Sequence, residues 1–292
     1  MNRREFVLTT AAAAASSAAA ASARPPLCIF SKHMAQLDWS ALGVRAKEMG
    51  FDGIDLTVRP KGHVLPERVT EDLPRALEAI RKSGSDVMMV TTDLKSASDP
   101  AAKPTFAAMQ KLGLKLYKVG YWRYSAKERV EQTLEQCRGH FRSLIELGSA
   151  YGVVAGLHNH SGEYVGSAVW DFREILRDAA PAQAGYYFDP GHATVEGGSF
   201  GWRASLDLAV SRLKMSAIKD FYWEKREGRW RTAWCPLGQG MVNWPEIFKT
   251  YAKAGFAGPL SLHVEYGKDD MNDIAKDLAF LKAEVSKAYG LS

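Results

Sequence analysis

Short apolar segments alternate with amphipathic segments along almost the whole chain, and this alternation limits the folds that the sequence can adopt. We expect strands at residues 27–30, 53–58, 86–92, 115–119, 153–157, 185–188, 213–218 and 259–264. We expect helices at residues 39–49, 71–83, 106–112, 126–151, 170–179, 244–254 and 269–288. Eight strands that alternate with helices over about 265 residues are typical of a (β/α)₈ TIM barrel, an α/β fold.

The main alternative is a doubly wound open sheet. Such a sheet usually carries a glycine-rich phosphate loop after its first strand, whereas residues 31–34 of this chain read Ser-Lys-His-Met. A weak internal repeat also favours the barrel. Residues 48–56 and 253–261 both read as a helix end, a glycine, an aromatic residue, one further residue, a glycine and a strand.

The first 23 residues are expected to form a separate targeting segment. Residues 3–8 read Arg-Arg-Glu-Phe-Val-Leu, a twin-arginine pattern, and an alanine-rich run follows at residues 11–21. Residues 21–23 (Ala-Ser-Ala) have the small residues of a cleavage site. A disordered alanine-rich tail is the alternative. We therefore predict a signal peptide at residues 1–23, a barrel at residues 24–292 and a periplasmic location reached by the twin-arginine route.

Composition excludes several classes of partner. The net charge is +5 and is spread along the chain without a basic block, so the sequence gives no support for nucleic-acid binding. No stretch of the body is long and apolar enough to span a membrane. Three cysteines are too few for a disulfide framework, and buried free thiols are expected. Assembly into a homo-oligomer is left open.

Polar residues gather at the carboxyl ends of the expected strands, which is where TIM barrels build their active sites. Only His140 of the seven histidines falls in the middle of an expected helix. Two of the others, His158 and His160, are two residues apart, so in a strand their side chains face the same way. The six histidines at strand ends are His33, His63, His158, His160, His192 and His263.

Charged residues occur at the same strand ends. The acidic residues there are Asp55, Glu163, Asp189 and Glu265, and the lysines are Lys118 and Lys219. Histidine and carboxylate side chains that converge on one rim are typical of a divalent metal site. A site built from thiolates would need paired cysteines, which the sequence lacks.

Several motifs resemble those of the xylose-isomerase-like TIM barrel superfamily, and the resemblance runs from residue 27 to the C-terminus. Residues 50–56 (Gly-Phe-Asp-Gly-Ile-Asp-Leu) are similar to the family's Gly-aromatic-Asp-Gly-apolar-Glu-Leu. Residues 188–192 (Phe-Asp-Pro-Gly-His) match its sixth-strand motif, and residues 217–220 (Ala-Ile-Lys-Asp) resemble His-apolar-Lys-Asp in its seventh strand. Residues 236–240 and 258–262 complete the match. The superfamily includes sugar phosphate isomerases and epimerases, inosose isomerases and dehydratases, and the endonuclease IV type.

The resemblance implies a divalent metal, but its usual ligands are rearranged here. The family uses Glu, Asp, His and Glu from strands five to eight. This chain keeps Asp189 in the sixth strand but has His158 in the fifth and Ala217 in the seventh. The eighth-strand position reads His263, with Glu265 two residues later. A metal-free or differently liganded site is the alternative. We predict one divalent ion (Mn, Mg, Co or Zn) held by His160, Asp189, His263 and Glu265.

Sugar isomerisation, epimerisation and water elimination share one step, in which a proton leaves the carbon next to a carbonyl and an enediolate forms. That step needs a base and a cation near the oxygen. Residues 221–242 are longer than a usual connection and predict a lid or an interface. We predict catalytic roles for Glu163, His158, Lys219 and Glu265. We predict substrate contacts from Asp55, His63, Trp122, His192 and Lys219.

The resemblance implies a small carbohydrate as the partner and leaves three functions open. The first is an exported sugar isomerase or epimerase. The second is a lyase or dehydratase of the same fold, acting on a keto-inositol or a 3-keto-glycoside. The third is a non-catalytic sugar-binding barrel, suggested by Ala217 where the family has histidine. Endonuclease activity is disfavoured because a three-metal cluster needs more histidines and glutamates than this rim supplies.

Overall fold

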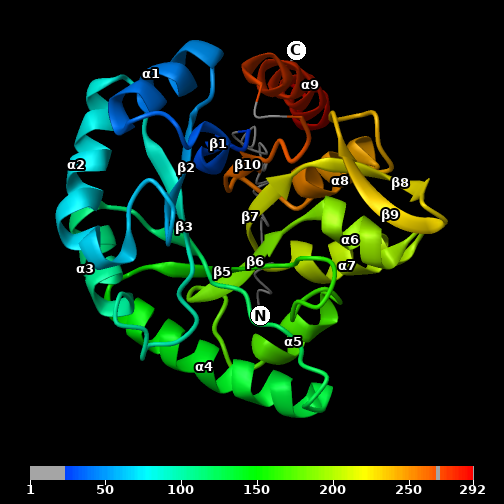
Figure 1. Ribbon diagram of the computed structural model, residues 1–292, viewed down its shortest axis with the longest axis horizontal. Coiled ribbons are helices and arrows are strands. Elements are labelled where there is room, and N and C mark those ends of the chain that lie inside the picture. Colours follow the sequence, from blue (N-terminus) through cyan, green and yellow to red (C-terminus); the bar gives the residue numbers. More distant parts are fainter. Residues whose placement is uncertain (1–23, 268–269, 292) are drawn as a thin grey trace, which may run out of the picture.

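The computed structural model describes residues 24–267 and 270–291, so the predicted signal peptide at residues 1–23 lies outside the described residues. Eight parallel strands close into a barrel in the order β1-β10-β7-β6-β5-β4-β3-β2, and helices surround them (Figure 1). The predicted (β/α)₈ fold is therefore confirmed. The barrel strands are β1 (Leu27–Phe30), β2 (Gly53–Val58), β3 (Val87–Thr92), β4 (Leu116–Lys118), β5 (Val154–His158), β6 (Ala184–Phe188), β7 (Leu213–Ile218) and β10 (Leu260–Leu262).

The helices lie outside the barrel and shield its outer face. Strands β2 and β6 are buried along their whole length, as expected for parallel strands that are covered on both faces. Gly50 ends the first helix in a left-handed conformation with φ of 83°, which only glycine adopts without strain. The helices are α1 (Trp39–Met49), α2 (Val69–Lys82), α3 (Ala102–Leu112), α4 (Val130–Ala150), α5 (Trp170–Ile175), α6 (Pro190–Gly197), α7 (Gly201–Val210), α8 (Trp244–Lys253) and α9 (Met271–Tyr289). Two short 3₁₀ helices follow β1 and β2, at Ser31–Met34 and Pro66–Arg68.

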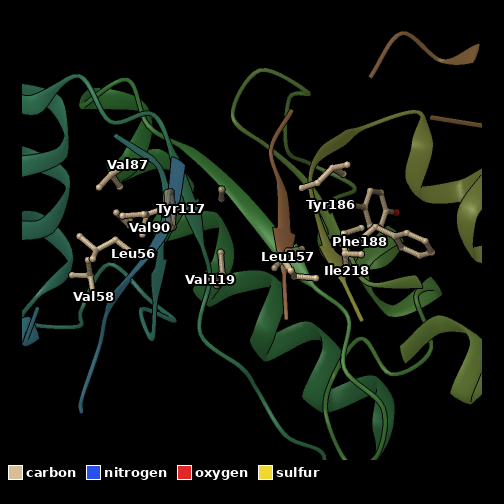
Figure 2. Packing of buried hydrophobic residues seen from close by; sticks show 14 of the residues in the cluster. Leu56, Val58, Val87, Val90, Tyr117, Val119, Leu157, Tyr186, Phe188 and Ile218 are labelled. Atoms are coloured by element: carbon tan, nitrogen blue, oxygen red, sulfur yellow. The ribbon is translucent and has the colours of Figure 1, made fainter. Parts of the chain in front are cut away.

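Apolar side chains fill two regions of the core. The larger region lies between strands and helices, and Figure 2 shows part of it, with Leu56, Val90 and Tyr117 on one side of the view. A smaller cluster joins Met89, Tyr187, Met215 and Ala217. These four residues come from β3, β6 and β7, so the barrel is a packed core rather than a pore.

The long segment after β7 contains strands that the sequence analysis did not predict. The structure places an antiparallel hairpin there, made of β8 (Asp220–Arg226) and β9 (Arg229–Cys235), and it extends outward beyond the barrel strands (Figure 1). Glu227 and Gly228 form the two-residue turn with φ of 53° and 77°. Positive φ at both positions is the signature of a type I′ turn, which suits the twist of a hairpin. Whether this hairpin acts as a lid or an interface stays a prediction.

Other sequence-based expectations are met in the described residues. Cys28, Cys137 and Cys235 are buried and free. None of the helices at residues 24–267 and 270–291 has the length and apolar character needed to cross a membrane.

Two helices that were not predicted from the sequence, α6 and α7, connect β6 to β7.

Candidate active site

A cavity of about 120 Å³ opens at the carboxyl ends of the barrel strands. This volume is below the roughly 300–1,000 Å³ of pockets for drug-sized ligands, so the cavity is suited to a small molecule. The side chains come from most of the barrel strands or from the residues that directly follow them. The lining residues are Phe30, Lys32, Arg59, Thr91, Lys118, Tyr121, His158, His160, Tyr187, Lys219, His263 and Glu265.

A buried carboxylate, Asp189, organises the centre of this pocket. It directly follows β6 and caps the N-terminus of α6, where its Oδ1 accepts a hydrogen bond from the His192 backbone N–H at 3.0 Å. Its Oδ2 lies 3.1 Å from the Lys219 ammonium and 3.1 Å from His158 Nε2. Asn159 fixes the backbone of Asp189 through two hydrogen bonds of 2.7 and 2.9 Å. The carboxylate is thus held rigidly beneath the pocket.

The charge state of this centre follows from its surroundings. Burial alone would raise the pKa of Asp189, but the neighbouring Lys219 ammonium, with the two histidines, holds this pKa well below its usual range. Burial lowers the pKa of His158 to about 3, so its imidazole is neutral. The His158 Nε2–H therefore donates to Asp189, and Nδ1 accepts from the Tyr121 hydroxyl at 2.7 Å. With both nitrogens engaged, His158 orients the carboxylate and has no free lone pair.

A second buried carboxylate, Asp55, lies under the opposite side of the cavity. Its oxygens accept hydrogen bonds from Thr91 at 2.7 Å, Ser261 at 2.8 Å and Tyr187 at 3.2 Å. The Tyr187 hydroxyl also meets His263 Nε2 at 3.1 Å, which links Asp55 to a residue that lines the cavity. Burial raises the pKa of Asp55 to about 6.

Two lining residues keep a lone pair available for proton transfer. His160 donates its Nδ1–H to the Ser161 carbonyl at 2.9 Å, which leaves Nε2 unprotonated. Glu265 is 23% exposed at its side chain, and Lys32 donates to its Oε2 at 2.9 Å. Burial would raise the pKa of Glu265, but Lys219 and Lys32 lower it overall. His160 follows β5 and Glu265 follows β10, with β6 and β7 between them in the barrel, so they line different sides of the cavity.

The structure brings together most of the predicted site residues. His158, His160, Lys219, His263 and Glu265 line the cavity. Asp189 and Asp55 lie directly beneath that lining, as the hydrogen bonds above show. The His192 ring packs against the His160 ring with centroids 3.9 Å apart, one layer behind the cavity wall.

Three predicted residues do not reach the cavity. The Glu163 side chain is 68% exposed and forms an ion pair with Arg123, because the chain turns away after β5 through a left-handed residue, Gly162, with φ of 95°. His63 Nδ1 bonds with the Thr57 hydroxyl at 3.2 Å. The third residue, Trp122, packs against Phe141 of α4. The roles proposed for these side chains from sequence are therefore not supported by their positions.

The predicted metal ligands do not converge on one point. The Lys219 ammonium already lies against the Oδ2 atom of Asp189, and Glu265 is paired with Lys32. His263 Nε2 meets the Tyr187 hydroxyl at 3.1 Å, and its Nδ1 lies 3.9 Å from Glu265 Oε1. Within residues 24–267 and 270–291, no three His, Cys, Asp or Glu side chains form a group that could hold a metal ion. A divalent ion takes several lone-pair donors on one side, and these residues do not fit one.

Sequence reasoning missed the importance of Asp220, although it belongs to the quoted Ala-Ile-Lys-Asp motif. This buried carboxylate directly follows Lys219 and opens β8. It accepts hydrogen bonds from five N–H groups. They belong to the backbones of Phe221, Gly238, Gly240 and Val242 and to the indole of Trp244. Asp220 therefore fixes the base of the hairpin and the backbone that carries Lys219.

The hairpin also contributes to the site. Trp234 of β9 places its ring 4.9 Å from the Lys219 ammonium and 5.1 Å from the His192 ring. An aromatic face near a buried cation stabilises it. The register puts all three tryptophans of the hairpin on the same face. Trp234 is the one at the base of the hairpin, and this position brings it close to Lys219, which the sequence alone did not show.

Comparison with known proteins agrees with this architecture. The family model for the xylose isomerase-like TIM barrel matches residues 44–284. A xylose isomerase domain protein from Planctomyces limnophilus has a TM-score of 0.69 at 15% identity, over 92% of this chain and 100% of that chain. The 3-keto-D-glucoside 4-epimerase from E. coli has a TM-score of 0.69 at 15% identity, over 89% and 100%.

A third solved structure is a xylose isomerase-like TIM barrel protein from Mycobacterium smegmatis in complex with magnesium. Its TM-score is 0.70 at 15% identity, over 93% of this chain and 99% of that chain. At such identities the likeness shows the fold alone. No curated protein matches the sequence significantly. The match to the family model covers most of the chain, and the protein therefore belongs to the xylose isomerase-like TIM barrel family.

Proposed function

We propose that the protein is a sugar epimerase or isomerase that moves a proton on the carbon beside a carbonyl of a sugar or keto-sugar. One observation carries the proposal. A lysine ammonium, fixed by the buried Asp189, lies in a pocket that also presents two groups able to accept a proton, His160 and Glu265. An enediolate reaction needs a cation near the oxygen and a base near the carbon.

In this proposal Lys219 stabilises the oxygen on which negative charge develops. Its ammonium is held by Asp189 at 3.1 Å and by the Trp234 ring, so little reorganisation is needed when the charge appears. One of His160 and Glu265 removes the proton from the carbon. The other, once protonated from solvent, returns a proton from a different side of the pocket, which inverts that carbon. Return by the same group to the neighbouring carbon, together with transfer of the hydroxyl proton from one enediolate oxygen to the other, gives an isomer instead.

Aromatic side chains suit the apolar C–H faces of a sugar. Phe30, Tyr121 and Tyr187 line the cavity together with the polar groups. Solved structures of similar fold include proteins titled L-ribulose 3-epimerase and D-psicose 3-epimerase, at 15% and 14% identity. Their substrates are the class of molecule we propose for this chain.

The divalent ion (Mn, Mg, Co or Zn) stays a prediction from the sequence, and our mechanism includes no step that depends on it. The donor set does not fit a metal, since the central carboxylate is already paired with Lys219. When present in enzymes of this kind, such an ion polarises the carbonyl oxygen. We assign that electrostatic role to Lys219.

A substrate screen tests the proposed function. Purified protein is incubated with ketoses, inososes and 3-keto-glycosides, and the products are identified by mass spectrometry and chromatography. We expect an isomer of unchanged mass. Loss of water or of an aglycone would favour the lyase instead, and saturable binding without any product would favour a sugar-binding barrel. His160→Gln should abolish turnover, while the exposed helical residue His140, changed to Gln, serves as the matched control.

We also propose that the protein is exported by the twin-arginine route, which rests on the sequence of residues 1–23. Replacement of Arg3 and Arg4 by lysine should leave the protein in the cytoplasm of cells fractionated after expression. Normal periplasmic recovery of that double variant would contradict the proposal.

A further inference from the structure

Two cations of the pocket wall lie against aromatic rings. Lys118 ends β4, is 2% exposed and lines the cavity. Its ammonium lies 3.4 Å from the centroid of the Tyr121 ring. Arg59 follows β2, lines the same cavity, and its guanidinium carbon lies 5.4 Å from the Phe30 ring centroid. Within the described residues, neither cation forms an ion pair with a carboxylate.

Two of the nearby carboxylates form ion pairs with other lysines. Glu265 pairs with Lys32, and Asp189 pairs with Lys219. Two further acids act on Lys118 from a distance. Asp93 is exposed, and Asp55 lies under the cavity and accepts hydrogen bonds from three hydroxyl groups. The cavity wall therefore contains four cations, of which two are balanced by direct carboxylate contacts.

Burial of an ammonium without a counter-ion costs free energy, and the lowered pKa of Lys118 reflects this cost. Burial, with the neighbouring Arg59, lowers the pKa of Lys118 to about 7. If position 118 served only to fill space, an apolar side chain would do so at a lower free-energy cost than lysine. The arrangement instead suits a site whose anion arrives with the ligand. Arginine offers a planar fork for two oxygens, and lysine adds a point charge.

We infer that the substrate carries an oxyanion, a carboxylate or a phosphate, which binds between Arg59 and Lys118. This inference rests on the proposed function and names its substrate class. The two cations belong to strands β2 and β4, which flank β3, and β3 lies opposite β7 in the strand order of the barrel. Lys219 follows β7. A small acidic sugar thus has its anion on one side of the pocket and its reacting carbonyl on the other.

Calorimetric titration tests the inference without any need for turnover. Glucuronate, glucose 6-phosphate and neutral glucose are titrated into the full-length protein at low and high salt. We expect at least one anion to bind about tenfold or more tightly than glucose, with weaker binding at high salt. The tighter of the two anions identifies the carboxylate or the phosphate as the preferred group. Equal affinity for glucose and both anions, or no binding of either anion, would overturn the inference.

Variants locate the binding group. Arg59→Gln and Lys118→Met should each weaken binding of the preferred anion roughly tenfold to a hundredfold, as expected when a charge-assisted hydrogen bond is lost. Binding of neutral glucose should weaken less than binding of the anion. Lys103→Gln, at an exposed helical position, is the matched control. Arg59 is only partly buried, so its variant is informative even where Lys118→Met fails to fold. Unchanged anion affinity in folded Arg59→Gln would refute this site, while the screen of neutral keto-sugars tests the epimerase proposal independently.

Discussion

Asp220→Asn is the substitution that most directly tests how the structure holds Lys219 in place. Oδ1 of Asp220 accepts from the Phe221 and Val242 backbones at 2.8 and 3.2 Å. Oδ2 accepts from the Gly238 and Gly240 backbones at 3.0 and 3.3 Å and from the Trp244 indole at 3.0 Å. An asparagine amide has one acceptor oxygen. Whichever way it is turned, its NH₂ group faces two or three N–H donors.

The expected loss of stability follows from that geometry. Each buried donor left without an acceptor costs about 1–3 kcal/mol. Two or three such donors, some of them near solvent and able to recruit water, give a loss of roughly 3–5 kcal/mol. This is a large share of the ~5–15 kcal/mol that stabilises a typical domain. Since Lys219 precedes Asp220 directly, the variant should also lose activity in its folded fraction.

Denaturant unfolding followed by tryptophan fluorescence and circular dichroism measures the difference. Asp207→Asn is the matched control, because Asp207 is exposed on α7, and its change should stay within about 0.5 kcal/mol. If Asp220→Asn loses less than about 1 kcal/mol, the carboxylate does not hold the hairpin base as the hydrogen bonds indicate.

Three further outcomes follow from the structure. Gly185→Ala places a methyl group 2.0 Å from the Arg212 carbonyl oxygen. It should lower the free energy of unfolding by roughly 3 kcal/mol or more. The control is Gly139→Ala, in open space on α4, which should be neutral or stabilising by up to ~1 kcal/mol. The folded-state pKa of Asp55 is about 6, against an ordinary 3.8. The folded state therefore binds this proton more tightly than the unfolded state, and the protein becomes less stable as the pH rises from about 4 to about 7. Asp55→Asn should remove about 3 kcal/mol of that pH dependence, measured by denaturant unfolding across this pH range. Glu163→Gln should keep turnover within about twofold, because its exposed ion pair contributes little; a large loss in steady-state assays would place Glu163 back in the mechanism.

The fold was largely predictable because local signals agree with the tertiary structure. Strand β2 is a buried run that begins at Gly53, and α1 ends at a left-handed Gly50. The region from Pro190 to Val210 was harder, since Gly197, Gly198 and Gly201 interrupt its helical pattern, although Asp189 before Pro190 is a recognisable helix start. The β8–β9 hairpin was missed because its turn is Glu-Gly rather than the commoner Asn-Gly or Asp-Gly.

The site was predictable in outline only. Sequence spacing placed His158 and His160 on one side of a strand, and both line the cavity. It did not show that the chain turns away before Glu163 or that Lys219 takes the place beside Asp189. Those outcomes depend on strand register, including the irregularity between Tyr186 and Tyr187 in β6, which no residue pattern indicates.

We propose above all that the Lys219 ammonium, fixed by Asp189, stabilises an enediolate on a sugar. The most direct measurement is deuterium uptake by the substrate carbon next to the carbonyl, followed by NMR in D₂O with protein treated with a chelator. We predict uptake by the wild-type protein in the presence of chelator, a loss of about 10²–10³-fold in Lys219→Met, and no loss in Lys103→Met. Uptake that requires an added divalent ion, or that persists unchanged in Lys219→Met, would contradict the account.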